Sequence, residues 1–244
     1  MRKEEYKEVS FGENVVIEEK VKIGKGTIIG HNVVIHEETE IGENVIISDG
    51  VILGKKPYRA SNSAVTSETE LPPLRVKDNV KIGANSVIYR GCELGEKVFV
   101  GDIASIREDV QIGERTIIGK GVSVENKTRI GKRVKVETNA YITAYSTIED
   151  YCFIAPEVTF SNDNFLGRTE ERKKHFKGPT LKRGARIGAN ATLLPGVVIG
   201  EDTLVGAGSV VTKDLESKKI YVGAPAKYVR DVSEEQLLEN QNWE

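Results

Sequence analysis

The feature that most constrains the fold is an aliphatic residue that recurs at every sixth position. A first run extends from Phe11 to Leu53, and a second is unbroken from Val76 to Phe160. A third extends from Leu181 to Val211, and every position in the three runs is Ile, Leu, Val or Phe. This set is called the aliphatic ladder below. A period of six matches neither the 3.6-residue turn of a helix nor the simple alternation of a flat strand.

The residues around the ladder are patterned as well. Gly is frequent one residue after a ladder position, as at Gly12 and Gly24, where a corner needs either a positive φ or no side chain. Four residues after the ladder the side chain is small or β-branched, and both positions then point inward. Three six-residue units close one three-sided coil, and stacked coils pair at roughly 4.8 Å. We therefore predict an all-β parallel column of about ten coils.

Two insertions interrupt the ladder, at about 54–75 and 161–180. Counting faces around the coil places both loops on the same edge of the column, about 24 Å apart. Such loops are functional or neutral insertions. The second loop is cationic, which suits a phosphorylated partner such as a nucleotide, the alternative being a solvated run of charge. Its basic residues are Arg168, Arg172, Lys173, Lys174, His175 and Lys177.

The chain divides into one large domain, 1–232, and a C-terminal helix, 233–244. Ser233 and Gln236 have the spacing of a capping box at the start of that helix. We expect the helix to cover the last coil and protect its open edge.

Composition narrows the class of protein. The net charge of −2 lacks the basic surplus that nucleic-acid binding favours. The sequence has no apolar run long enough to span a membrane, and its start lacks the apolar stretch of a signal peptide, so we expect a cytoplasmic protein with no membrane partner.

The cysteines and histidines predict no metal or redox chemistry. Cys92 and Cys152 fall on the small inward position, more than three coils apart, and we expect two reduced core residues. His31 and His36 lack a third histidine one or two coils away, so no metal is expected.

The ladder, together with the segment RIGANATLLPGVVIGEDTLVGAGSVVTKDLESKKIYVGAPAKYVR, resembles the hexapeptide-repeat acyltransferases. The resemblance implies a left-handed β-helix and a homotrimer with acetyl-CoA in a groove between neighbouring chains. It implies that acetyl-CoA binds backbone at positions matching Ala189, Ala207 and Gly208. In this family, positively charged side chains contact the CoA phosphates, and the matching residues here are Lys213, Lys227 and Arg230. The alternative for each of them is a solvated surface charge.

The segment EVTFSNDNF before the second loop most resembles the branch that acylates amino groups of nucleotide-linked sugars. In that branch an Asn in this context lies near the sugar amine, which maps to Asn162, the alternative being an Asn that serves a corner turn. His175 is the candidate base. The expected substrate contacts are Asn126, Asp163, Arg168 and Arg172. We expect the small-residue groove and the cationic loop to share an edge of the column.

Two other functions remain open. One is an O-acyltransferase or an acyl-carrier-protein-dependent enzyme of this fold. Sugar O-acetyltransferases that resemble this chain carry a His just after the strand ending at Phe160, where this sequence reads Ser161, Asn162 and Asp163. The other is a non-catalytic scaffold, since stacked coils offer flat repetitive faces.

Overall fold

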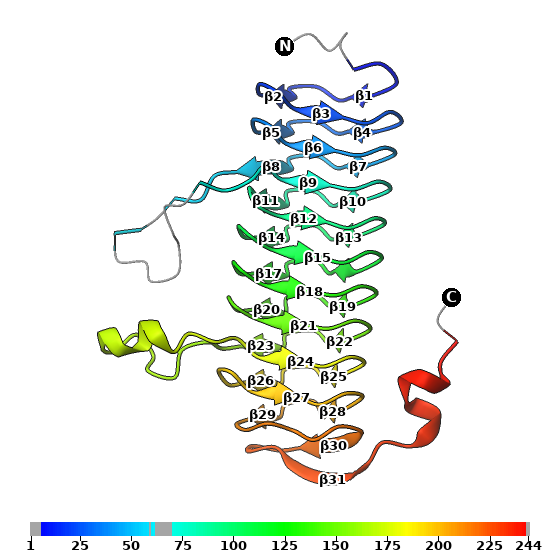
Figure 1. Cartoon of the computed structure of the whole chain (residues 1–244). Coiled ribbons are helices and arrows are strands. Elements are labelled where there is room, and N and C mark those ends of the chain that lie inside the picture. Colours follow the sequence, from blue (N-terminus) through cyan, green and yellow to red (C-terminus); the bar gives the residue numbers. More distant parts are fainter. Residues whose placement is uncertain (1–5, 59, 62–69, 243–244) are drawn as a thin grey trace.

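The computed structural model describes residues 6–58, 60–61 and 70–242. Its strands form three sheets, one on each face of a three-sided column (Figure 1). Sheet A contains β1 (Ser10–Phe11), β4 (Ile28–Ile29), β7 (Ile46–Ile47), β10 (Lys81–Ile82), β13 (Phe99–Val100), β16 (Ile117–Ile118), β19 (Lys135–Val136), β22 (Phe153–Ile154), β25 (Arg186–Ile187), β28 (Leu204–Val205), β30 (Lys219–Val222) and β31 (Lys227–Asp231). Sheet B contains β2 (Val16–Ile17), β5 (Val34–Ile35), β8 (Ile52–Lys55), β11 (Val87–Tyr89), β14 (Ser105–Ile106), β17 (Ser123–Val124), β20 (Tyr141–Ile142), β23 (Thr159–Phe160), β26 (Thr192–Leu193) and β29 (Val210–Val211). Sheet C contains β3 (Lys22–Ile23), β6 (Glu40–Ile41), β9 (Arg75–Val76), β12 (Glu93–Leu94), β15 (Gln111–Ile112), β18 (Arg129–Ile130), β21 (Thr147–Ile148), β24 (Thr180–Leu181) and β27 (Val198–Ile199).

The chain winds through sheets A, B and C in turn as a left-handed β-helix (Figure 1), so the predicted fold class is confirmed. Each strand pairs in parallel with the strand one coil away, as Ser10 with Ile28 and Phe11 with Ile29. The column makes about 11 turns, one more than the ladder predicts. The extra turn arises because β30 pairs with β28 although its sequence has left the six-residue period.

The ladder forms the core. Ladder residues such as Ile118, with no exposed surface, point inward as the second residue of their strands. The small inward positions carry hydroxyls and thiols that donate to carbonyls of the next coil. Thr27 Oγ1 donates to the Gly42 carbonyl at 3.1 Å, and Cys92 Sγ donates to the Arg107 carbonyl at 2.9 Å. Such bonds give inward polar groups a partner inside a narrow apolar column. Among the described residues, the buried Thr39 hydroxyl is an exception and has no hydrogen-bond partner.

Close approach of successive coils explains the glycine that follows the ladder. A Cβ on Gly24 would lie 2.5 Å from the backbone of Gly42. The positive φ that recurs at the corners occurs three residues after the ladder, as at Gly26 (+71°) and Asn14 (+55°). The glycine after the ladder is therefore required because no side chain fits there, and not because its φ is positive.

Both insertions leave from the edge where the chain passes from sheet B to sheet C, named the loop edge here. The first follows β8 and the second follows β23, five strands apart in sheet B, as predicted (Figure 1). Arg90 clamps the base of the first loop. Its guanidinium donates to the carbonyls of Leu71 at 2.9 Å and Glu37 at 3.1 Å and to the Glu38 carboxylate. Residues 59 and 62–69 of this loop lie outside the described chain.

The two ends of the column are closed by different means, and the C-terminal end differs from the expectation. At the first coil, Tyr6 packs edge-on against Phe11 and donates its hydroxyl to the Val21 carbonyl at 2.9 Å. At the last coil, β31 folds back antiparallel to β30. The predicted capping helix is two single 3₁₀ turns, η3 (Glu234–Gln236) and η4 (Leu238–Asn240), which lie along the flank of the column (Figure 1).

The expected capping box is wrong, and so is the placement of the helix over the last coil. Ser233 makes no side-chain cap bond, because its hydroxyl instead donates to Glu235 at 3.1 Å. The flank position follows from Asp202, whose carboxylate accepts the Leu238 N–H at 3.2 Å. Among the described residues, no helix combines the length and apolarity that crossing a bilayer requires.

We expect Ile118→Asp to abolish folding. Burying a carboxylate in place of a large aliphatic removes packing worth about 2–5 kcal/mol and adds the cost of an unpaired buried charge. Gln111→Asp, an outward exposed position of β15, is the matched control. Circular dichroism and size exclusion of both variants test this. A folded Ile118→Asp protein with wild-type yield would contradict the packing assigned to the ladder.

The two thiols are expected to be inert in the folded protein. Burial raises the pKa of both Cys92 and Cys152 to about 12, so each thiol stays protonated near neutral pH. A thiolate-specific disulfide reagent at pH 8 should label neither cysteine in buffer and both in denaturant. Rapid labelling of either cysteine without unfolding would show that its coil opens locally.

Candidate functional site

A polar cleft lies on the loop edge, at the base of the second loop. Its cavity volume is about 240 Å³. Residues from three successive coils of sheet B and from the second loop line it. They are Glu125, Tyr141, Thr143, Ala144, Asn162, Asp163, Arg172 and Phe176.

The stacking of coils decides the shape of the cleft. Glu125 follows β17 and Asn162 lies just after β23, two coils further along. Two coil spacings separate these walls by about 10 Å along the column. Thr143 and Ala144, from the coil between them, are short and almost completely buried. A reacting group therefore has room between a carboxylate on one side and an amide on the other.

The second loop projects from the column (Figure 1), and residues at its base line one side of the cleft. Asp163 accepts the backbone N–H groups of Phe165 at 2.8 Å and Gly167 at 2.9 Å, and Arg172 Nη1 donates to the same carboxylate at 3.1 Å. These bonds outweigh the opposing effect of desolvation and lower the pKa of Asp163. The Arg172 guanidinium also lies 5.4 Å from the centre of the Phe176 ring. Asp163 and Arg172 thus brace the base of the loop and present charged groups at the mouth of the cleft.

Two carboxylates compete for one arginine below the cleft. Arg107 binds the buried Glu108 through two bonds, Nε at 2.9 Å and Nη2 at 3.2 Å, and lies 3.8 Å from Glu125. Burial raises the pKa of Glu125, Arg107 opposes the rise, and the Glu108 charge adds to it. Burial also raises the pKa of the neighbouring Tyr141, with Glu125 as the next cause. The phenol therefore stays protonated beside a carboxylate that is unusually ready to accept a proton.

The predicted acceptor residues separate into two groups. Asn162, Asp163 and Arg172 meet in the cleft. Asn126 is buried beneath it, where its Nδ2 donates to Glu108 at 3.2 Å. Arg168 is exposed on the second loop and is not among the cleft residues.

His175 also lies on the second loop outside the cleft. It is more than half exposed, 3.3 Å from the Glu171 carboxylate, and its ring stacks near Phe165 at 5.8 Å. The loop includes the 3₁₀ turn η2 (Glu170–Lys174), in which Lys173 pairs with Glu170 and Lys174 with Glu171. Much of the predicted positive charge is therefore compensated within the loop itself.

The small-residue groove occupies another corner. Ala189, Ala207 and Gly208 follow sheet A strands, at the corner where the chain passes from sheet A to sheet B. The expectation that groove and loop share an edge is wrong, because sheet B lies between them. The Gly208 N–H donates to the Ala189 carbonyl at 2.8 Å, and a Cβ on Gly208 would meet no described atom within 4 Å. The surface at this corner is backbone with open space above it.

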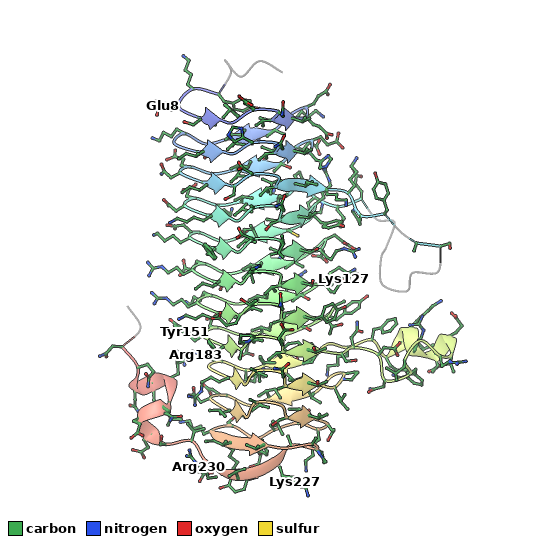
Figure 2. All side chains as sticks on the ribbon, turned by 180° about the vertical axis from the view of Figure 1, so that it is seen from behind. Glu8, Lys127, Tyr151, Arg183, Lys227 and Arg230 are labelled. Atoms are coloured by element: carbon green, nitrogen blue, oxygen red, sulfur yellow. The ribbon has the colours of Figure 1, made fainter. Side chains whose placement is uncertain are left out.

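A second cavity, of about 410 Å³, lies at the C-terminal end and contains two of the three predicted phosphate-binding cations. Its lining residues are Lys213, Asp214, Glu216, Lys219, Tyr221, Ala226, Lys227 and Tyr228. Arg230, on the same strand as Lys227 (Figure 2), is exposed and donates to the Asp231 carbonyl at 3.2 Å. Lys213 and Lys227 are therefore brought together, with Lys219 as an additional cation that the sequence did not single out.

The sequence interpretation missed four cleft residues, of which Glu125 and Tyr141 are titratable and Thr143 and Phe176 are not. The sequence does carry a signal for Glu125, at the position directly after each ladder residue. At the other two corners this position is usually Gly. At the loop edge it carries side chains in consecutive coils, namely Tyr89, Arg107, Glu125, Thr143 and Ser161. Side chains retained at a close-packed corner mark this edge as distinct from the other two.

Within residues 6–58, 60–61 and 70–242, no three His, Cys, Asp or Glu side chains are grouped so that they could hold a metal ion. His36 is paired instead, with Nδ1 at 3.1 Å from the Glu18 carboxylate.

Comparison with known families and proteins matches most of the column. The family described as bacterial transferase hexapeptide (six repeats) matches residues 20–55, 91–126 and 178–213. The hexapeptide repeat of succinyl-transferase matches 73–101 and 109–144, and together these ranges cover more than half of the chain.

Individual relatives match shorter segments. Galactoside O-acetyltransferase of Escherichia coli (strain K12) is 35% identical over 36% of this chain and 45% of its own length. Serine acetyltransferase of Buchnera aphidicola is 38% identical over 36% of this chain and 30% of its own length. The chain thus spans less than half the length of these curated relatives. A solved structure of a GDP-perosamine N-acetyltransferase mutant from Caulobacter crescentus, with CoA and GDP-perosamine, is 25% identical with a TM-score of 0.44, covering 62% of this chain and 57% of that one.

Proposed function

Because the chain belongs to the hexapeptide-repeat transferase family, we propose that it is an acetyl-CoA-dependent N-acyltransferase acting on the amino group of a nucleotide-linked amino sugar. The observation that carries the proposal is the polar cleft at the base of the second loop, in which Asn162 faces the space between coils. A family member needs a place for an acceptor beside the donor, and this cleft combines confinement with charged and amide groups.

Acetyl-CoA is the proposed donor. Backbone at Ala189, Ala207 and Gly208 would pair with the amides of its pantetheine arm, because this corner presents main chain without bulky side chains. The CoA phosphates would meet the cations of the C-terminal cavity, Lys213 and Lys227, with Arg230 beside it. No metal is required in this arrangement.

The acceptor would enter from the loop edge. Asn162 would orient the amine, while Arg172 at the cleft mouth suits a diphosphate, for which a guanidinium is a bidentate donor. Arg168, exposed further along the second loop, would meet the nucleotide outside the cleft. Backbone amides would stabilise the oxyanion of the tetrahedral intermediate.

The proposed assembly is a homotrimer with its sites between chains. Groove and cleft lie on different corners of one column, so a second chain can place its groove against the first chain's loop edge. Leu166 of the second loop is 83% exposed, and Phe165 beside it is partly exposed. An exposed apolar segment on a loop that projects from the column suits contact with a neighbouring chain.

O-acyl transfer is the second candidate. It is favoured by the names of the two curated relatives, a galactoside O-acetyltransferase and a serine acetyltransferase. The cleft residues described here include no histidine, whereas a hydroxyl acceptor depends more on a strong base than an amine does.

A co-substrate screen tests the proposal. Acetyl-CoA would be combined with a panel of amino-sugar nucleotides and matched hydroxyl acceptors, and free thiol release would be measured. We expect turnover with amino sugars only. Thiol release with hydroxyl acceptors alone would favour O-acyl transfer, and failure to bind acetyl-CoA by calorimetry would favour a scaffold.

Asn162→Ala is expected to lower kcat/KM for the acceptor by about 10²-fold, since it removes a group that positions the amine. The change leaves the core untouched, so the melting temperature should stay within a few degrees. Asn164→Ala, exposed on the same loop and outside the cleft residues, is the control. Equal kcat/KM in wild type and Asn162→Ala would remove Asn162 from the site.

Lys227→Ala is expected to raise KM for acetyl-CoA roughly tenfold, as the loss of one charge-assisted contact with a phosphate predicts. The KM for acetyl-pantetheine, which lacks those phosphates, should not change. Lys135→Ala, exposed in the middle of sheet A, controls for general loss of positive charge. If both donors weaken equally, Lys227 acts on structure and not on the phosphates.

A further inference from the structure

We propose that Glu125 is the general base of the transfer, accepting the proton that the acceptor nitrogen loses. This inference rests on the proposed function and adds a catalytic residue to the same cleft. It assigns to a carboxylate on the rigid column the role for which the sequence had suggested His175 on the loop.

The position of Glu125 is the first support. Glu125 and Asn162 line the same cleft from coils two apart, and the coil between them contributes the short residues Thr143 and Ala144. An amine oriented by Asn162 would therefore present its N–H groups toward the Glu125 wall. His175 is not among the cleft residues and is held at the loop surface near Glu171.

The ion pairing below the cleft is the second support. Arg107 directs two short bonds to Glu108, which has 5% of its side chain exposed, and only a 3.8 Å contact to Glu125. Glu125 keeps 24% of its side chain exposed toward the cleft. The Glu108 carboxylate is thus neutralised by Arg107, while the Glu125 carboxylate stays open to a ligand.

The charged and titratable groups that face Glu125 come from three places. They are Arg107 and Glu108 on the coil before it, Tyr141 on the coil after it, and Asp163 and Arg172 of the second loop, which share its cleft. Burial and the Glu108 charge raise the pKa of Glu125 against the effect of Arg107, which makes it a better proton acceptor than an exposed glutamate.

The proton balance is simple. The amine nitrogen attacks the thioester carbonyl carbon, a C–N bond forms, and the carbonyl electron pair moves to oxygen. Glu125 accepts a proton from the positively charged nitrogen of this intermediate. The intermediate then collapses, the C–S bond breaks, and the proton passes from Glu125 to the departing sulfur. The products are an amide and the CoA thiol, and Glu125 is again a carboxylate.

Glu125→Gln, which keeps shape and removes basicity, is the test variant. We expect kcat to fall about 10²-fold with KM for both substrates within threefold of wild type, the size typical of a lost general base. In the wild type, kcat should decrease at low pH as Glu125 becomes protonated. The Glu125→Gln variant should not show this decrease. Glu125→Asp should keep the decrease with an intermediate kcat, which separates basicity from folding. Glu18→Gln is the matched control, at the same repeat position after sheet B strand β2, five coils away.

The outcomes distinguish the two proposals. If wild type is active and Glu125→Gln retains its kcat and pH profile, the base is not Glu125 and the proposed function stands. If wild-type protein neither binds acetyl-CoA in calorimetry nor releases thiol with any amino-sugar nucleotide, the proposed function fails and the role of Glu125 with it.

Discussion

The whole structure depends on parallel hydrogen bonding between one coil and the next. Each two-residue strand is too short to be stable alone, and it gains its partners only because the strand above repeats it in the same register, as Phe11 does with Ile29. The Gly12 N–H, for example, donates to the Ile29 carbonyl at 2.7 Å. This constraint requires an inward-pointing aliphatic side chain at fixed intervals. It also requires the corners of successive coils to lie close to each other. Stability is therefore a sum over neighbouring coils, and the two end coils need their own protection.

The same close packing distinguishes the loop edge from the other two edges. Where a corner approaches the next coil within contact distance, a side chain cannot be accommodated, and Gly follows the ladder. At the loop edge, the column accepts side chains at this position in successive coils, among them Arg107 and Glu125. Side chains along this edge are therefore spaced at regular intervals of one coil. The inserted loops leave from this edge, and the second one completes the cleft.

The cleft combines rigid and adaptable parts. Glu125, Thr143 and Ala144 belong to coils that are hydrogen-bonded on both sides, so their positions are set by the column. Asp163 and Arg172 belong to a loop held by its own turn bonds and ion pairs. Such an arrangement suits a site that keeps reacting groups in place while an outer segment adjusts to a bulky acceptor.

The period, the three faces, the burial of the ladder and the edge from which both loops leave can all be deduced from the sequence, because inward burial repeats locally and can be counted. The sequence also indicated Asn162 and the cations Lys213 and Lys227. Three other relations emerge only when the coils are stacked. Glu125 and Asn162 line one cleft, the groove lies a face away from the loops, and the C-terminal turns pack on the flank at Asp202. These relations depend on which side chains meet across stacked coils and on how a non-repeating loop folds back. Neither follows from a period, since contacts between distant residues arise only when the coils are assembled.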